Sequence, residues 1–138
     1  MTISFIFHDF SGEIQDKIVQ IKAAKNAKLF VPGWRMSRVF NDILTGYLNI
    51  NLARICVAYY GNIPVGCFLQ VDDYSSDIFV RKAFRRKNIA KTMLEISKYK
   101  DQKKKTEIFA TGAECSHKFF KKMIEEKIIN NDQYYPIF

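Results

Sequence analysis

A pair of apolar strands joined by a tight turn is the feature that most constrains how this chain can fold. Residues 55–60 and 63–70 are rich in Ile, Val, Tyr, Phe and Cys, and Gly61 and Asn62 between them tolerate the positive φ of a two-residue hairpin turn. Both faces of these strands are largely apolar, so neither face can remain in water. Helices usually cover such a sheet on both sides. The sequence therefore predicts a layered α/β domain with this hairpin in its sheet.

The predicted hairpin brings two of the three cysteines together. If the turn is Gly61-Asn62, residues whose numbers sum to 123 face each other, which places Cys56 directly opposite Cys67. The odd number of cysteines and the lack of C-x-x-C spacing disfavour a disulfide framework and a structural zinc site. We therefore expect buried, reduced thiols and no metal.

The other elements follow from hydrophobic periodicity and turn residues, with Ser11 and Ser37 as predicted helix caps and Lys17 on a solvated basic helix face. The chain shows no repeat and no linker, so residues 1–138 are expected to form one domain. The predicted strands outside the hairpin are 3–7, 77–80, 107–110 and 134–138, and the predicted helices are 13–26, 37–47, 90–99 and 116–127.

Composition limits the class of protein more than its function. The net charge of +8 and the pI near 9.4 favour a polyanionic partner, which includes nucleic acid, the phosphates of a cofactor and an acidic protein. The N-terminal residues lack the pattern of a secretory signal, and no apolar run is long enough to span a membrane. These features predict a cytoplasmic protein.

A basic loop between the strand 77–80 and the helix 90–99 carries the clearest chemical signal. A strand that runs into a loop at a helix N-terminus forms a phosphate site, because unpaired backbone N–H groups and the positive end of the helix dipole converge there. Asn88 tolerates the left-handed region and Ala90 is small, so both allow a ligand to approach the backbone. Arg85, Arg86 and Lys87 add positive charge around the anion.

The segment Val80–Ala90 resembles the acetyl-CoA signature of the GCN5-related N-acetyltransferase (GNAT) superfamily, in which a strand is followed by Arg/Gln-x-x-Gly-x-Gly/Ala. Arg85, Asn88 and Ala90 occupy the three diagnostic places, with Asn88 in place of the first glycine. The hairpin at 60–68 and the run Phe-Phe-Lys-Lys-Met at 119–123 are similar to further parts of that family. The resemblance implies a mixed, mostly antiparallel sheet of about six strands, flanked on both faces by about four helices.

The resemblance also implies a cosubstrate and its contacts. In that family the sheet splays apart between the fourth and fifth strands, and the pantetheine arm of acetyl-CoA lies in the gap. Mapped onto this chain, Phe79 and Val80 would hold the pantetheine, and Phe120 in the segment 116–120 would flank the thioester. The pyrophosphate would bind backbone amides of the loop, formed by Arg85, Arg86, Lys87, Asn88, Ile89 and Ala90.

Acetyl transfer to an amine needs a route for two protons. A lysine-like amine with a pKa near ~10.4 must become neutral before it attacks, so a nearby base is useful. Asp77 is our first candidate base because it lies on the strand beside the cofactor, and the alternatives are Asp72, Asp73 and Glu114. The family's usual tyrosine acid is replaced by Phe119-Phe120, so Tyr134, Tyr135, Ser116 or water would substitute for it, or the protein is slow or inactive.

Three functions remain open from the sequence. The first is an enzyme that acetylates a protein or a small-molecule amine. The second acts on a nucleic-acid-linked amine, such as an aminoacyl-tRNA or a DNA base, which a basic protein would approach readily. The third is a non-catalytic GNAT-fold module that binds a partner or a polyanion. The short tail after Ile129 is also compatible with a sheet edge covered by a second subunit in a homodimer.

Overall fold

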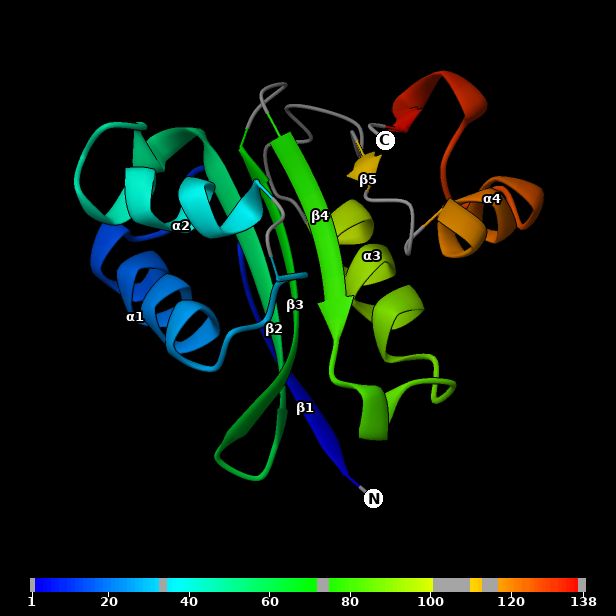
Figure 1. Cartoon of the computed structure of the whole chain (residues 1–138), viewed down its shortest axis with the longest axis horizontal. Helices are drawn as coiled ribbons and strands as arrows, with labels where there is room; N and C mark the ends of the chain where they lie inside the picture. Colours follow the sequence, from blue (N-terminus) through cyan, green and yellow to red (C-terminus); the bar gives the residue numbers. More distant parts are fainter. Residues whose placement is uncertain (1, 33–34, 72–74, 101–109, 113–116, 137–138) are drawn as a thin grey trace.

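A four-stranded antiparallel sheet forms the middle layer of the molecule (Figure 1). The structure, a computed structural model, describes residues 2–32, 35–71, 75–100, 110–112 and 117–136. The strands lie in the order β1 (Ile3–His8), β2 (Ala53–Tyr60), β3 (Ile63–Val71) and β4 (Ser75–Val80). One face is covered by α1 (Ile14–Asn26) and α2 (Met36–Leu44), and the other by α3 (Ile89–Tyr99) and α4 (His117–Glu125). The predicted layered arrangement is confirmed.

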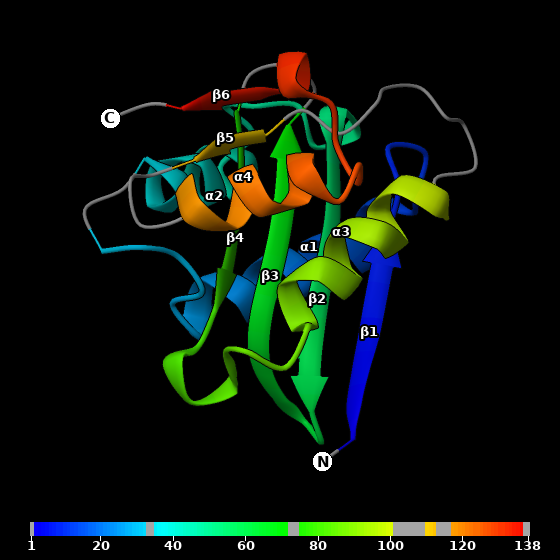
Figure 2. The same cartoon turned by 90° about the vertical axis from the view of Figure 1, so that its right-hand side faces the viewer.

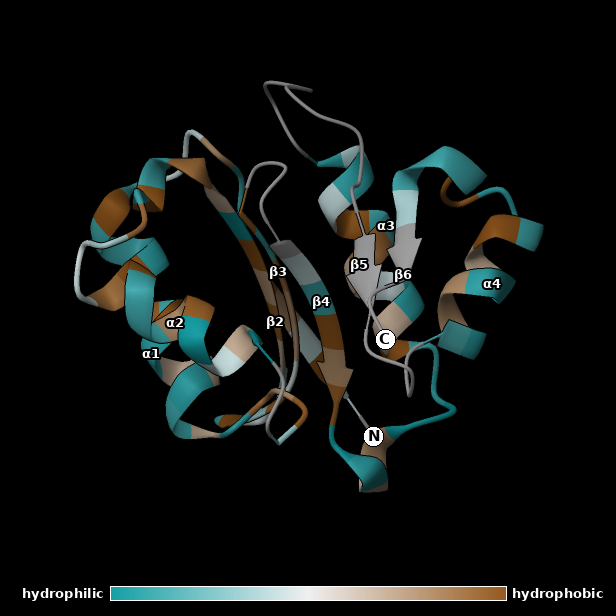
Figure 3. Ribbon diagram, turned by 45° about the horizontal axis from the view of Figure 1, so that its top comes forward, coloured by the Kyte–Doolittle hydropathy of each residue, from teal (hydrophilic) through white to brown (hydrophobic). Residues whose placement is uncertain are grey.

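The central hairpin separates two apolar cores. Alternate residues of β2 and β3 point to opposite faces, so Cys56, Ala58 and Phe68 pack toward α3 and α4. Val57, Cys67 and Leu69 pack toward α1 and α2. All six are 0–2 % exposed, so the middle of this hairpin is buried on both faces. Figure 3 shows the corresponding apolar bands on the inner sides of the helices.

The register of the hairpin differs from the prediction by one residue. Tyr60 faces Ile63 and Tyr59 faces Pro64, as the turn predicts, but Ala58 then faces Gly66 because Val65 is an extra residue in β3. Val57 therefore faces Cys67, and Cys56 faces Phe68. The predicted pairing of Cys56 with Cys67 is wrong, and the two thiols lie on opposite faces of the sheet.

Three local predictions in the first third of the chain are also wrong. The N-cap of α1 is Glu13, while the Ser11 side chain donates instead to Asp9 Oδ1 at 2.7 Å. The N-cap of α2 is Arg35, so Ser37 lies inside the helix. Lys17 is fully buried rather than solvated, and its Nζ donates to the carbonyl oxygens of Phe10 at 2.9 Å and Ile50 at 3.2 Å.

The second half of the chain adds a separate pair of short strands. β5 (Ala110–Gly112) pairs in parallel with β6 (Tyr134–Pro136), and Figure 2 shows this pair beside β4. Among the described residues the strands form two sheets, of four and two strands, where the sequence predicted one sheet of about six. The ladder is therefore interrupted between β4 and β5, the position at which the resemblance implies a gap. No helix in the described ranges is long and apolar enough to span a membrane.

Candidate functional site

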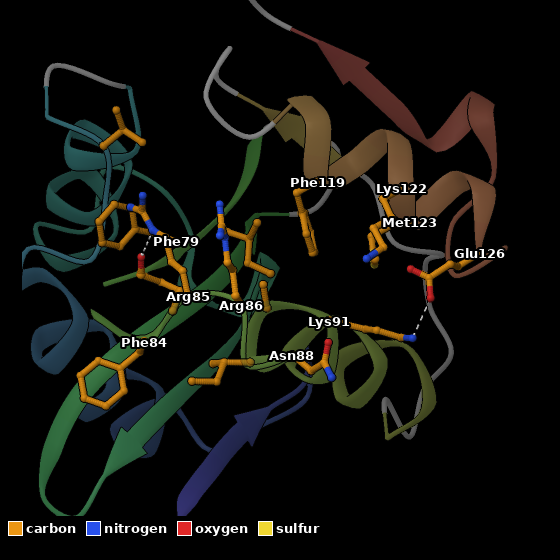
Figure 4. A pocket seen from close by; sticks show the side chains of 15 residues that line it. Phe79, Phe84, Arg85, Arg86, Asn88, Lys91, Phe119, Lys122, Met123 and Glu126 are labelled. Atoms are coloured by element: carbon orange, nitrogen blue, oxygen red, sulfur yellow. Dashed lines mark hydrogen bonds and ion pairs between the residues drawn. The ribbon is translucent and has the colours of Figure 1, made fainter. Parts of the chain in front are cut away.

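A pocket of about 350 Å³ opens where β4 ends and α3 begins (Figure 4). Its floor is the C-terminal half of β4, one wall is the loop that leads to α3, and the other wall is one side of α4. A short 3-10 helix, η2 (Lys82–Phe84), lies at the start of the loop. The residues that line the pocket are Val31, Ile78, Phe79, Val80, Phe84, Arg85, Arg86, Asn88, Ile89, Ala90, Lys91, Phe119, Lys122, Met123 and Glu126.

The loop turns into the helix through two left-handed residues. Asn88 is the N-cap of α3 with φ 60° and ψ 17°, which confirms that asparagine serves here as the φ-tolerant residue. Its side chain makes no capping hydrogen bond. The first backbone N–H groups of the helix have no intrahelical acceptor, so the pocket contains donors suited to an anion.

Arg86 adopts a φ of 62°, which the sequence did not predict. An arginine in this region costs roughly 1–2 kcal/mol relative to the right-handed region. The surrounding loop must supply that free energy, and residues held in such conformations cluster at ligand sites. Lys28 and Lys127 adopt similar φ values of 55° and 61° after α1 and α4, so what distinguishes Arg86 is that it also lines the pocket.

Arg85 is fixed against β4 rather than projecting freely into the pocket. Its Nε donates to the carbonyl oxygen of Val80 at 2.8 Å, and its Cζ lies 5.5 Å from the centroid of the Phe79 ring. The guanidinium thus holds the loop across the end of the strand. We conclude that Arg85 shapes the site as well as adding charge to it.

The backbone groups at the free edge of β4 can be assigned from its hydrogen bonding to β3. Arg81 N donates to Val65 O at 2.8 Å, so the alternation of an antiparallel ladder turns the backbone of Val80 and Ile78 toward the outer edge. The Val80 carbonyl is engaged by Arg85, and the Ile78 amide donates to the Asp77 carboxylate at 2.8 Å. Side chains of this chain therefore already contact the edge that an added strand would use.

Charge in the pocket is strongly asymmetric. Four lining residues are cationic (Arg85, Arg86, Lys91 and Lys122), while Glu126 is the acidic residue of that lining. Lys91 Nζ and Glu126 Oε1 form an ion pair of 2.8 Å between α3 and the end of α4. The hydrogen bond from Lys91 lowers the pKa of the Glu126 carboxyl, and the same bond raises the pKa of the Lys91 ammonium.

The predicted cofactor residues divide into two groups. Phe79, Val80, Arg85, Arg86, Asn88, Ile89 and Ala90 all line this pocket. Lys87 is exposed outside the lining, and Phe120 is fully buried with its ring stacked 5.0 Å from that of Tyr134. Its neighbour Phe119 lines the pocket instead.

The candidate base Asp77 lies on the other face of β4. It is 5 % exposed and borders a small cavity with apolar residues of the α1–α2 layer, among them Leu29, Met36 and Phe40. The pocket described above also reaches Val31, which follows α1. The small cavity is only about 10 Å³, and Ile78 and Phe79 line both it and the basic pocket, so Asp77 is packed against the α1–α2 layer rather than open to a second pocket.

Tyr134 belongs to a buried cluster near the same strand. Its hydroxyl lies 2.7 Å from His117 Nδ1, and its side chain is 8 % exposed. Burial, and then the charge of Asp77, raise the pKa of the Tyr134 phenol, so this group stays protonated at neutral pH. Ser116, Glu114, Asp72 and Asp73, named from the sequence, lie outside the described residues, as does Cys115.

Sequence reasoning missed the wall that α4 contributes. Phe119, Lys122, Met123 and Glu126 follow the spacing i, i+3, i+4, i+7, which places them on one face of a helix. This periodicity was present in the sequence, but nothing in it indicated that the face borders a cavity. Among the described residues, no cluster of His, Cys, Asp and Glu could hold a metal ion.

Comparison with known proteins identifies the fold. No protein-family profile matches the sequence, and no curated protein sequence matches it. Solved structures do match over nearly the whole chain. A predicted acetyltransferase from Clostridium acetobutylicum, solved with acetyl-CoA, is 12 % identical over 99 % of this chain and 96 % of its own, with a TM-score of 0.55.

Two further structures give the same result. A ribosomal-protein-alanine N-acetyltransferase from Brucella melitensis biovar Abortus 2308 is 14 % identical over 99 % of this chain and 98 % of its own (TM-score 0.55). An aminoglycoside acetyltransferase from an uncultured soil metagenomic sample, in complex with trehalose, is 15 % identical over 99 % and 93 % (TM-score 0.54). At these identities the likeness concerns the fold, and the chain has the fold of GNAT acetyltransferases.

Proposed function

We propose that this protein is an N-acetyltransferase that uses acetyl-CoA to acetylate a primary amine of an acceptor. The observation that carries the proposal is the pocket at the end of β4, where the left-handed Asn88 opens α3 beside four cationic side chains. Such a site suits a ligand with several phosphates at one end. The acetyltransferases that share this fold support the same reading.

The cosubstrate would enter along the α3–α4 face of the sheet. The Arg85 amide already donates to Lys82 O at 3.3 Å, so the amides of residues 86–90 would bind the pyrophosphate. The pantetheine would lie beside Phe79 and Val80 in the interruption between β4 and β5. Because the Val80 carbonyl is held by Arg85, the pantetheine would pair with the remaining edge groups of β4 or displace that guanidinium. Phe120, which is buried, would support the thioester end through Phe119 rather than contact it.

The acceptor amine would approach from the opposite face, where the α1–α2 layer would have to move away from Asp77, because the space beside that carboxylate is only about 10 Å³. The amine nitrogen attacks the thioester carbon, the C–N bond forms and the C–S bond breaks. Asp77 would take the proton that the amine loses, and the thiolate of CoA would leave with a proton from Tyr134 or from water. The raised pKa keeps Tyr134 protonated but makes it a weaker proton donor, and a thiolate is a tolerable leaving group without one.

Two alternatives use the same fold differently. A nucleic-acid-linked amine as acceptor would suit the net charge of +8. A non-catalytic module would suit the phenylalanines at 119 and 120, because neither side chain can donate a proton. A polyanion binder loses affinity steeply as salt rises and needs no acetyl-CoA, which separates it from the enzyme.

Thermal unfolding with acetyl-CoA, CoA or ATP tests the proposed cosubstrate. A ligand at about a hundred times its dissociation constant adds ~2.7 kcal/mol to the free energy of unfolding, which raises the midpoint by several degrees. We expect acetyl-CoA and CoA to raise it and ATP to have little effect. No shift, or an equal shift with ATP, would refute the cosubstrate in favour of a polyanion-binding module.

Release of free CoA thiol in the presence of candidate amines tests turnover. Asp77→Asn keeps the size of the side chain but removes the base, so kcat should fall by about 10²–10⁴-fold while acetyl-CoA binding is unchanged. Equal turnover by the wild type and the variant would exclude Asp77 as the base. Tyr134→Phe in the same assay reports on the leaving-group proton.

A further inference from the structure

The ion pair between Lys91 and Glu126 has an unusual place in the pocket. Lys91 is the third residue of α3, so its ammonium lies in the first helical turn, close to the positive end of the helix dipole. No acidic residue occupies that first turn. A cation is unfavourable at this position unless an anion lies near it. Glu126 supplies one at 2.8 Å from another part of the chain, and Glu95 of α3 adds a weaker electrostatic interaction.

Glu126 is surrounded by the positive charge of the site. Lys122 of α4, four residues before Glu126, also lowers the pKa of the Glu126 carboxyl. Both partners of the pair line the pocket together with Arg85, Arg86 and Lys122, as Figure 4 shows. A carboxylate thus lies within a lining that otherwise suits phosphate groups.

The ion pair between Lys91 and Glu126 also costs little free energy to break in favour of another anion. The side chains of Lys91 and Glu126 are 33 % and 34 % exposed, and exposed ion pairs contribute little to stability because water and salt screen them. A phosphate dianion carries twice the charge of a carboxylate and offers more acceptor oxygens to an ammonium group. The Lys91 ammonium would therefore interact more strongly with a phosphate than with Glu126. The Glu126 carboxylate would then lie close to the negatively charged phosphate.

We propose that Glu126 is an internal substitute for a phosphate group of the ligand: it pairs with Lys91 in the free protein and releases Lys91 when the ligand binds. Lys91 is then a ligand-binding residue, and Glu126 sets the affinity and selectivity of the site. A ligand without a phosphate at this position leaves the pair intact and gains nothing from Lys91. This inference rests on the proposed acetyl-CoA site and adds to it a competing group within the chain.

The test compares acetyl-CoA binding by the wild type, Glu126→Gln and Glu125→Gln, measured by calorimetry. Glu125 is the exposed last residue of α4 and does not line the pocket, so its replacement gives the same change in net charge at a neighbouring position. We expect E126Q to bind acetyl-CoA roughly two- to fivefold more tightly than the wild type, the range that an exposed ion pair supports. E125Q should bind as the wild type does.

A second pair of variants tests Lys91 itself. Lys91→Met should weaken acetyl-CoA binding by at least a similar factor, while Lys121→Met, which removes an exposed charge of α4 outside the lining, should change it less. Midpoints of unfolding without ligand establish that each variant is folded. The difference in acetyl-CoA affinity between E126Q and the wild type should decrease as the salt concentration rises, because the side chains at 91 and 126 are partly exposed and salt screens their charges.

Dephospho-CoA identifies which phosphate takes the place of Glu126. If E126Q loses its advantage with dephospho-CoA, the group is the 3′-phosphate, and if the advantage persists, it is the pyrophosphate. The proposal is overturned if E126Q binds acetyl-CoA no more tightly than wild type or E125Q while the wild type binds it normally. If neither the wild type nor E126Q binds acetyl-CoA, the proposed function itself fails.

Discussion

The centre of the sheet and its β4 edge differ in backbone pairing and in burial. In β2 and β3 the backbone pairs on both sides and side chains such as Phe68 and Leu69 are 0–1 % exposed. At β4 the ladder stops and β5 lies alongside without extending it (Figure 2). Polar side chains contact the outward-facing backbone there. The centre therefore provides stability, while the edge uses Arg85 and Asp77 in place of a neighbouring strand.

The difference also concerns backbone conformation. The hairpin contains one extra residue, Val65, and a positive φ only at Gly61, which glycine adopts without strain, whereas the loop beyond β4 holds the non-glycine residues Arg86 and Asn88 at positive φ within three residues. Strain of this kind costs free energy that only the rest of the fold or a bound ligand can offset. We infer that the buried centre is what allows the edge to remain open.

The largest expected effect is the difference in stability between a variant of the sheet centre and a variant of the β4 edge. Phe68→Ala removes a fully buried ring from β3 and leaves a cavity beneath α3 and α4, so the free energy of unfolding should fall by about 3–5 kcal/mol. Phe79→Ala removes a partly buried ring from the edge strand and should cost only about 1–2 kcal/mol. Urea denaturation measures both.

The two variants should rank in reverse for ligand binding. Phe79 lines the pocket and supports the Arg85 guanidinium, so its loss should weaken acetyl-CoA binding in protein that is still folded. Equal losses of stability for Phe68→Ala and Phe79→Ala would show that β4 belongs to the core and would remove the contrast drawn above.

A smaller expected effect tests whether the conformation of the loop before α3 is needed for acetyl-CoA binding. Asn88→Val places a β-branched side chain at φ 60°, a conformation that valine strongly avoids, so the loop should rearrange and its amides should leave their positions. We expect acetyl-CoA binding to weaken by about tenfold or more, which corresponds to roughly 1.4 kcal/mol. Calorimetric titration measures it.

Asn88→Gly is the matched control, because glycine adopts the same φ without a steric cost. It should bind acetyl-CoA at least nearly as well as the wild type. Unchanged binding by Asn88→Val would mean that the loop conformation is not what the ligand recognises.

Local signals explain which parts of the fold could be predicted from the sequence. The Gly61-Asn62 turn, the apolar strands and the helix after Asn88 each depend on residues close together in the chain, and the structure contains all three. The bulge at Val65 shifts the register by one residue, and the only sequence signs of it are Pro64 and Gly66, which flank it.

Long-range contacts explain most of the rest. Lys17 looks like a surface lysine in any window of sequence, and its burial depends on the carbonyl of Ile50, which lies 33 residues away. The basic loop could be found because it is contiguous, whereas Glu126 enters the pocket only through the packing of α4 against α3. The face of Asp77 likewise depends on the register of β4 against β3.

The smallest expected effect concerns the two thiols of the central hairpin. Cys56 and Cys67 lie on opposite faces of the sheet, so they cannot form a disulfide, and a reductant should shift the unfolding midpoint by less than about 1 °C. Burial raises the pKa of Cys56 to about 12 and that of Cys67 well above its usual value, so both lack the reactive thiolate at pH 8. In a Cys115→Ser variant, a thiol reagent should therefore modify only the unfolded protein. Rapid labelling of the native protein would show that the centre opens as readily as the β4 edge, and the division between a closed centre and an open edge would then be wrong.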